Sequence, residues 1–515
     1  MKTAYRLTLL LALSLLGACG GGGSSGSSGS TGGSGGSGGA SMNYTIGGSV
    51  SGLTAGSGAV LLDNGGDALT VPANATSFTF STSLASGSTY AVTVQTQPSG
   101  ETCTVGNGSG TATADVTSVS LACTSNFAAG GSNVTAVTVG PGPASSAYQT
   151  FNIPLVSVTV CQGSTCGVIQ DVLLDSGSEG LRVMASALTA AGVTLTPIGD
   201  PNTPGNTIHE CAPFVDGYAW GAVDSATVKI GGEATASAIP IQVIDDSSSP
   251  NPAVPSSGCI NGSDLASVNA FDANGVLGVG VFPQDCGNTC ATVASSDVYW
   301  TCTSGGSCSA TTLETSDQVE NPVVAFTTDN NGAIIQLPAI AAAGATTASG
   351  YLVFGIGTES DNGLGSAAVL TASDPQGAIT TSYDGLMLTN SLIDSGSNAL
   401  FFPNSSSSPI TLCGSSGGAA QFYCPMSNPP SSPLGLSAVM QGQSGTTSNV
   451  TFQIVDLSDL SPDNFALPDV GGVATNTSKF SDYFDWGLPF FYGRTVFMGI
   501  AGASAGGNSG PFYAY

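Results

Sequence analysis

Basic residues are scarce in this chain. Its 515 residues include only 6 Lys and Arg against 33 Asp and Glu, which gives a formal net charge of −27. Such an acidic chain offers no cationic surface to a phosphate backbone, so we expect no nucleic-acid partner. The same sign of charge argues against electrostatic adhesion to anionic lipid headgroups.

Histidine is almost absent, since His209 is the one example. Any metal site built on two or more histidines is therefore excluded, and a Ser-His-Asp mechanism would depend on this residue alone. We expect His209 to be structural, with a chemical role as the alternative, and we expect no metal or cofactor. Long helical periods are also scarce, whereas Ser, Thr, Val and Gly are plentiful, which favours an all-β chain.

Thirteen cysteines are present, and twelve of them follow Cys19. No CxxC pair or histidine cluster supports zinc, and an even count in an exported chain favours disulfides formed in an oxidising compartment. Ten of the twelve lie near a neighbour, as Cys103 with Cys123, Cys161 with Cys166, Cys286 with Cys290, Cys302 with Cys308, and Cys413 with Cys424, and the remaining two are Cys211 and Cys259.

Residues 1–19 form an export signal, in which two basic residues precede the apolar run Leu7–Leu16. This run is too short to span a bilayer. The segment ends in Leu-Gly-Ala-Cys, which resembles the bacterial lipobox, so we expect lipidation of Cys19 and a membrane anchor made of acyl chains. An ordinary cleaved signal peptide is the alternative. Gly20 in place of Asp resembles the pattern that sorts lipoproteins to the outer membrane, with the side that the protein faces left open.

The middle of the chain divides by composition. Residues 20–42 are nearly all Gly and Ser and predict a flexible linker. Residues 43–125 contain short alternating apolar segments between Gly, Asn and Ser turns, which predicts a small β-sandwich that resembles Ig-like or transthyretin-like modules. We expect this module to be a spacer, with weak carbohydrate or protein binding as the alternative. Residues 126–145 are rich in Gly, Ala and Pro and are interpreted as a second linker.

A repeated motif carries the functional argument. Residues 172–184 read VLLDSGSEGLRVM and residues 391–403 read SLIDSGSNALFFP. Each copy places Asp-Ser-Gly-Ser between two apolar stretches, so Asp175 and Asp394 occupy equivalent places in two halves of the chain. We predict that two similar lobes each bring one carboxylate to a shared cleft. The alternative is a repeated β-hairpin in which the Asp caps a turn.

The residue types of the motif suit acid–base chemistry. Gly177 and Gly396 permit a tight turn. The hydroxyls of the motif are expected to support the dyad, Ser178 and Ser397 by donating to the neighbouring carboxylate, and Ser176 and Ser395 by bonding to the backbone of the other lobe. Two close carboxylates share one proton and titrate as a pair. The ionised partner can activate a water and the protonated one can polarise a peptide carbonyl.

The region from about 146 to the C-terminus resembles the pepsin-type aspartic peptidases, and the layout of lipobox, Gly/Ser tract and terminal GPFYAY resembles the DUF3443 family of bacterial lipoproteins. The pepsin resemblance is carried by several segments in the right order. They are a flap-like hairpin at 214–232, the threaded strand NGVLGVG at 274–280, the Gly-rich strand GYLVFGIGT at 350–358, and WGLPFFYGRTVF at 486–497.

This resemblance implies a bilobal double barrel with an N-lobe at 146–345 and a C-lobe at 346–515. It also implies that Phe214, Tyr218 and Trp220 line the cleft as part of the flap, with core or turn aromatics as the alternative. The polar insertion 284–321 is expected to be a surface loop.

The chain departs from the pepsin pattern in several places, and the flap Tyr is replaced by Phe214 or supplied by Tyr218. Arg182 stands where pepsins usually have a Trp, and Asp485-Trp486 precedes Gly487 where pepsins have two apolar residues. We interpret Arg182 as a surface ion-pair partner of Glu179, with a cation that lowers the shared pKa of the dyad as the alternative.

These observations together predict a lipid-anchored aspartic endopeptidase of the bacterial cell envelope that acts on peptides or proteins. A catalytically silent pepsin-like binding protein and a structural or adhesive surface lipoprotein are the alternatives. The sequence leaves the oligomeric state open.

Overall fold

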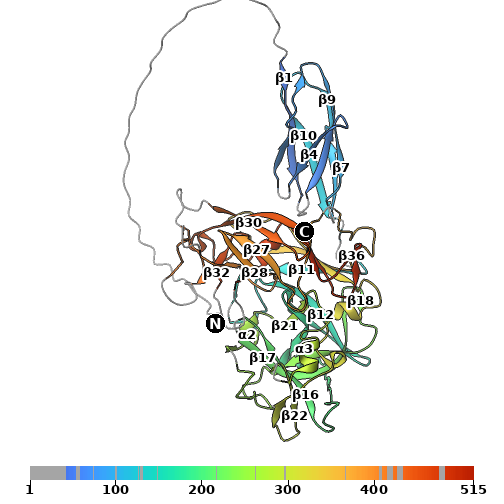
Figure 1. Cartoon of the computed structure of the whole chain (residues 1–515), viewed down its shortest axis with the longest axis vertical. Helices are drawn as coiled ribbons and strands as arrows, with labels where there is room; N and C mark the ends of the chain where they lie inside the picture. Colours follow the sequence, from blue (N-terminus) through green and yellow to red (C-terminus); the bar gives the residue numbers. More distant parts are fainter. Residues whose placement is uncertain are drawn as a thin grey trace, which may run out of the picture.

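The computed structural model describes residues 42–515 apart from 54–57, 73–74, 99–100, 126, 128–130, 148, 216, 261, 295–296, 366, 405–408, 415–420, 426–432 and 475–481. The predicted signal peptide, Cys19 and all but the last residue of the predicted Gly/Ser linker lie outside the described residues. The described chain is built from strands with a few short helices, which confirms the all-β class (Figure 1).

The first ten strands form two four-stranded sheets, in the orders β5-β2-β10-β8 and β4-β3-β7-β9, and the small pair β1-β6. Their bounds are β1 (Asn43–Tyr44), β2 (Ile46–Ser51), β3 (Ala59–Asp63), β4 (Asp67–Val71), β5 (Ser77–Thr79), β6 (Leu84–Ala85), β7 (Thr89–Thr96), β8 (Glu101–Gly106), β9 (Ser109–Thr111) and β10 (Val116–Ser125). Alternate residues of β3 and β7 are buried, as expected for strands with one face on a core. Both sheets contribute to one hydrophobic cluster, and Figure 1 shows this unit at one end of the molecule.

A sheet of eighteen strands runs through most of the remaining chain. Its strands are β11 (Val134–Val139), β12 (Pro154–Gln162), β13 (Thr165–Asp175), β14 (Glu179–Met184), β15 (Thr196–Pro197), β16 (Thr207–Pro213), β17 (Gly217–Ile230), β18 (Glu233–Ala234), β19 (Ile239–Ile244), β20 (Ser263–Asp264), β21 (Gly275–Val279), β22 (Tyr299–Cys302), β23 (Cys308–Ala310), β24 (Gly332–Leu337), β25 (Ala348–Phe354), β26 (Val369–Thr371), β34 (Arg494–Gly499) and β37 (Phe512–Ala514).

A seven-stranded sheet, in the order β31-β30-β27-β28-β33-β29-β32, completes the second half. Its strands are β27 (Ile379–Tyr383), β28 (Leu386–Ile393), β29 (Leu400–Phe402), β30 (Leu434–Gln441), β31 (Thr447–Ile454), β32 (Gly471–Val473) and β33 (Asp485–Trp486), and β35 (Ser504–Ala505) pairs with β36 (Asn508–Ser509). The helices are α1 (Ala185–Ala190), α2 (Val268–Phe271), α3 (Asn288–Thr292) and the 3-10 turns Thr315–Asp317, Pro322–Ala325, Leu457–Asp459 and Leu488–Phe491.

The segment 126–145, interpreted from the sequence as a linker, contains a strand. β11 pairs with β25 along six residue pairs and also with β12. The interpretation missed it because Gly, Ala and Pro flank a short alternating run, in which Val134, Val137 and Val139 are buried. The two halves of the chain are therefore joined through a common sheet.

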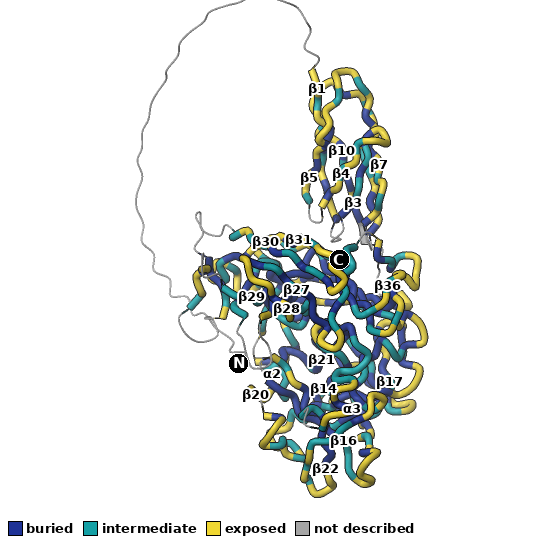
Figure 2. Tube along the Cα trace, in the orientation of Figure 1, coloured by how far each residue is buried: buried dark blue, intermediate teal, exposed yellow. Residues whose placement is uncertain are grey.

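The main core also crosses the division between the halves. One cluster of buried apolar residues extends from Val137 on β11 to Tyr515 at the C-terminus. Figure 2 shows this buried interior as dark blue tube through the larger part of the molecule. Sheet and core together hold the two Asp-Ser-Gly-Ser turns in a fixed relation to each other.

Candidate active site

Each Asp-Ser-Gly-Ser turn lies at the end of a strand, and both turns have the same strand neighbours. β13, which ends at Asp175, pairs in parallel with β21, and β21 pairs antiparallel with β14, the strand after the turn. β28, which ends just before Asp394, pairs in parallel with β33, and β33 pairs antiparallel with β29. In each half, a strand from far along the chain is thus threaded between the two strands that flank the motif.

Glycine in the threaded strand makes this arrangement possible. A Cβ atom added at Gly278, which pairs with Asp175, would lie 2.6 Å from the carbonyl oxygen of Ser178. A Cβ atom added at Gly487 would lie 2.7 Å from the carbonyl oxygen of Ser397. Either contact is too close for a side chain, so the two glycines let the turns lie directly on the threaded strands.

Four hydrogen bonds cross between the two turns. Ser176 N–H donates to Ser395 Oγ over 3.0 Å, and Ser395 N–H donates to Ser176 Oγ over 2.9 Å. The hydroxyl of Ser176 donates to the carbonyl of Ile393 over 2.9 Å, and that of Ser395 donates to the carbonyl of Leu174 over 2.8 Å. Both serines are buried, so these bonds fix the separation of the turns.

Each carboxylate is held by its own turn. The Gly177 N–H donates to Asp175 Oδ1 and the Gly396 N–H to Asp394 Oδ1, both over 2.8 Å. The Ser178 hydroxyl donates to Asp175 Oδ2 over 2.5 Å, and the Ser397 hydroxyl donates to Asp394 Oδ2 over 2.9 Å. The structure therefore brings together all eight residues of the predicted dyad and its support.

The two carboxyls meet at the glycines of the turns. A Cβ atom added at Gly396 would lie 2.7 Å from Oδ1 of Asp175 and 3.2 Å from Oδ1 of Asp394. Burial raises the pKa of Asp394 well above its usual range, and the charges of Asp175 and Asp485 and a hydrogen bond with Asp175 raise it further. Such a pair holds one proton between two carboxyls.

Two further acids lie close to the dyad, and sequence reasoning did not assign either to the site. Burial raises the pKa of Glu179 to about 8, and the charge of Asp175 also raises it, although the Phe282 N–H that donates to its Oε1 lowers it. Burial raises the pKa of Asp485 to about 7, against a lowering hydrogen bond from Ser397. An alignment of the two halves could have singled out Asp485. It pairs with the strand before the second turn at the position where the apolar Val276 pairs with the strand before the first turn.

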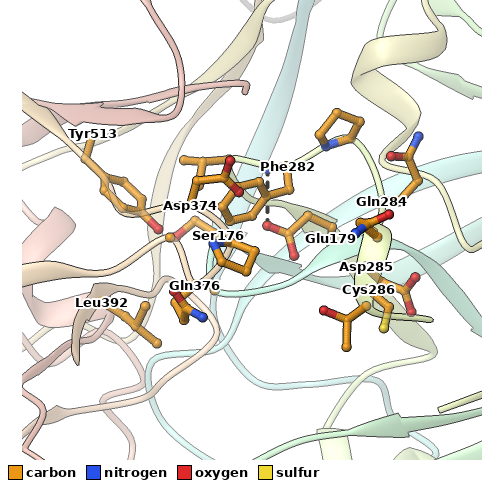
Figure 3. A pocket seen from close by; sticks show the side chains of 18 residues that line it. Ser176, Glu179, Phe282, Gln284, Asp285, Cys286, Asp374, Gln376, Leu392 and Tyr513 are labelled. Carbon is orange, nitrogen blue, oxygen red and sulfur yellow. Dashed lines mark hydrogen bonds between the residues drawn. The ribbon is translucent and has the colours of Figure 1, made fainter. Parts of the chain in front are cut away.

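A cavity of about 560 Å³ opens beside the first turn (Figure 3). Gly177 lines it and also touches the dyad, since a Cβ atom added there would lie 2.6 Å from Cγ of Asp394. Its other walls come from the segment after β21, the turn between β26 and β27, and Tyr513 on β37. The cavity thus borders the first turn at Ser176, Gly177 and Glu179, and neither carboxyl of the dyad is among the described residues that line it.

The comparison with family models matches residues 129–515 to the family described as a protein of unknown function, DUF3443. The chain belongs to the DUF3443 family. The match starts before β11 and covers the sheet and both turns. The comparison with curated proteins finds no match.

All twelve cysteines of the DUF3443 chain that were expected to form disulfides do so. The five neighbouring pairs are bonded, and the remaining two, Cys211 and Cys259, bond to each other. Six disulfides are consistent with an oxidising, extracytoplasmic compartment. None of the helices in the described part of the chain has the length and hydropathy needed to cross a bilayer.

The interpretation of Arg182 in this DUF3443 chain as a surface ion-pair partner of Glu179 is wrong. Its side chain is buried, and its ion pairs are with Glu210, at 2.6 Å, and Asp285, at 3.2 Å. Its contact with Glu179 is a hydrogen bond to the backbone carbonyl over 2.7 Å. The sequence could not indicate this, because Glu210 and Asp285 reach Arg182 only through the pairing of distant strands.

The predicted flap residues are packed against other groups. Phe214, at the turn between β16 and β17, contacts the ring of Phe271 at 5.2 Å. Tyr218 and Trp220 are buried around the Cys211–Cys259 bond. None of the three is among the described residues that line the cavity beside Gly177.

His209 is also buried, and its ring stacks on that of Trp220 at 5.3 Å. Burial lowers its pKa to about 4. Its contacts are those of a neutral core histidine, and it lines a separate cavity of about 230 Å³ with Trp220.

The insertion 284–321 is more than the polar surface loop that its composition indicated. It contains α3 and the hairpin β22–β23, and β22 extends the sheet beside β16. Buried Tyr299 donates a hydrogen bond to Asp285 over 2.6 Å. The insertion thus supplies part of the ionic cluster around Arg182.

Proposed function

We propose that this protein is an aspartic endopeptidase that hydrolyses peptide bonds with Asp175 and Asp394. The observation that carries the proposal is the pair of carboxyls, brought together by two equivalent turns that four buried hydrogen bonds hold in place. A turn-capping role does not require two copies to face each other or to share a proton.

The proposed reaction follows from the shared proton. The ionised carboxylate takes a proton from a water, whose oxygen attacks the peptide carbonyl carbon, while the protonated carboxyl donates to the carbonyl oxygen. In the tetrahedral intermediate the C–N bond then breaks as the nitrogen accepts a proton from the pair. The raised pKa of Asp394 supports its assignment as the protonated partner.

Finer features of the fold belong to this proposal. We propose a bilobal arrangement of pepsin type, supported by the matching threaded strands β21 and β33. We also propose that residues 43–125 are a small β-sandwich, supported by two four-stranded sheets on one core. The proposed lipid anchor at Cys19, and with it an outer-membrane location, is supported by the lipobox-like sequence alone.

The test is cleavage of denatured protein at acid pH by the purified secreted part of the chain, with and without a statine-type inhibitor. We expect cleavage that the inhibitor blocks and that Asp175→Asn abolishes. The matched control is Asp384→Asn, an exposed acid in the β27–β28 turn, where the backbone conformation at φ 48° also suits Asn.

Binding of the inhibitor without any cleavage by the wild-type chain would contradict the proposal and indicate a silent binding protein. Neither binding nor cleavage would favour a structural or adhesive role.

A further inference from the structure

Tyr513 is buried, and its side chain faces the cavity beside Gly177. The side chain comes from β37 near the C-terminus, is 2% exposed, and lines the cavity beside Gly177. Among the described residues, no hydrogen bond of this hydroxyl is found, and Figure 3 shows it pointing toward Ser176 in the middle of the lining side chains. A buried hydroxyl left open to a cavity is suited to a ligand that hydrogen-bonds to it.

Glu179 adds an acid to the same cavity. Its Oε1 accepts from the Phe282 N–H over 3.3 Å (Figure 3), and a backbone hydrogen bond from Val281 also favours its ionised form. Burial raises the pKa of Glu179 to about 8, so bringing a cation beside this carboxyl would favour its ionised form. Because Glu179 follows the first turn directly, a group bound to it lies close to the dyad.

The remaining polar groups of the cavity favour the same kind of ligand. Asp374, Gln376 and Gln284 supply acceptor oxygens, and none of the described lining residues is Lys, Arg or His. Asp285 also lines the cavity, but its carboxyl is already bonded to Arg182 and Tyr299. Glu179 and Tyr513 are therefore the two groups that a bound side chain can engage at depth.

We propose that this cavity binds a lysine or arginine side chain of the substrate, next to the bond that is cleaved, with Glu179 as the residue that determines this specificity and Tyr513 as a second hydrogen-bonding partner. This inference rests on the proposed peptidase function. It adds a substrate class, peptides with a basic residue beside the scissile bond, and the cavity of about 560 Å³ has room for such a long side chain.

The first experiment measures cleavage of a series of peptides that differ at one position beside the scissile bond, with Lys, Arg, Gln, Met or Glu. We expect kcat/KM for Lys and Arg to exceed that for Gln and Met by about tenfold, the factor typical of one charge-assisted hydrogen bond. Glu179→Gln should remove most of this ratio and Tyr513→Phe a smaller part of it. Glu314→Gln, an exposed acid outside the cavity, is the matched control and should keep the ratio.

The second experiment separates binding from catalysis. Fluorescently labelled peptides with Lys or Met at the same position are titrated against Asp175→Asn, with and without Glu179→Gln. We expect tighter binding of the Lys peptide, by about the same factor, and loss of the difference in the double variant. Cleavage without a preference for basic residues would overturn the proposed specificity of the cavity and leave the proposed peptidase function standing. Preferred binding in a chain that cleaves no peptide would overturn the proposed function and leave the cavity assignment standing.

Discussion

The two Asp-Ser-Gly-Ser turns have the same backbone interactions and different surroundings. The crossed hydrogen bonds and the bonds to each carboxylate have counterparts in the two turns, down to the 2.8 Å contacts from Gly177 and Gly396. The flanks differ because Glu179 stands opposite Asn398 in the repeat, and Val276 opposite Asp485. The duplicated part is thus the part that holds the carboxyls, whereas the unequal part sets their electrostatic environment.

The strand after each turn shows the same contrast. Arg182 on β14 occupies the repeat position of Phe401 on β29. In the first half this position carries a buried ionic cluster, and in the second half it carries a ring that packs near the ring of Phe422 at 6.2 Å. Equivalent backbone positions therefore stabilise the two halves by different physical means.

The largest expected effect comes from removing either member of the dyad. Asp394→Asn should reduce cleavage about as much as Asp175→Asn, by roughly 10³-fold or more, because each substitution removes one partner of the acid–base pair. The measurement is the initial rate on denatured protein under identical conditions. Unequal losses, with substantial activity left in one variant, would contradict equivalent roles for the two turns.

Replacing Arg182 by phenylalanine, the residue at the equivalent position of the second half, tests the ionic cluster. Arg182→Phe should lower the free energy of unfolding by roughly 3–5 kcal/mol, because it leaves the buried carboxyl of Glu210 without its 2.6 Å partner. Urea unfolding measures the loss, and adding Glu210→Gln should restore part of it. A single variant as stable as the wild type would show that the cluster does not stabilise this half.

Breaking the crossed hydrogen bonds should have a smaller effect that is equal in the two halves. Ser176→Ala and Ser395→Ala each leave one N–H and one carbonyl unpaired in a buried place, at a cost of about 2–3 kcal/mol. Chemical denaturation compares them with Ser316→Ala, an exposed serine. If only one of the two variants loses stability, the hydrogen bonds do not bind the turns as a symmetric pair.

The smallest expected effect concerns Asp485. Burial raises the pKa of Asp485 in the folded state from 3.8 to about 7. The contribution of Asp485 to the free energy of unfolding is therefore highest at pH values below its unfolded-state pKa, and it declines as the pH rises toward 7. Asp485→Val, which copies Val276, should remove this part of the decline.

The measurement for Asp485→Val is the free energy of unfolding at pH 4 and pH 7. As a control, Asp384→Asn should show the same change in the free energy of unfolding between pH 4 and pH 7 as the wild type. The decline that the raised pKa of Glu179 causes should remain in both variants. If the free energy of unfolding of Asp485→Val changed with pH as much as that of the wild type, the buried carboxyl of Asp485 would not be the cause of this decline.

Much of the site was predictable from local pattern. The apolar strand, the Asp and the turn glycine recur twice, and in both turns the glycine N–H donates to the Asp carboxylate. The even number of cysteines predicted disulfides, and in five of the six bonds the partners are neighbours along the chain. Glu179 and Asp485 were visible as residues but not as members of the site, since their burial depends on distant segments.

By itself, the sequence determined the strand-rich class and the repeated turn, because alternation, turn glycines and short-range spacing are local properties of the chain. Only the tertiary structure decided that Arg182 is buried with Glu210 and Asp285, that Trp220 packs on His209, and that Tyr513 reaches the cavity beside Gly177. These contacts join segments that are far apart along the chain. The strength of each charge depends on the solvent that the assembled fold removes from around it.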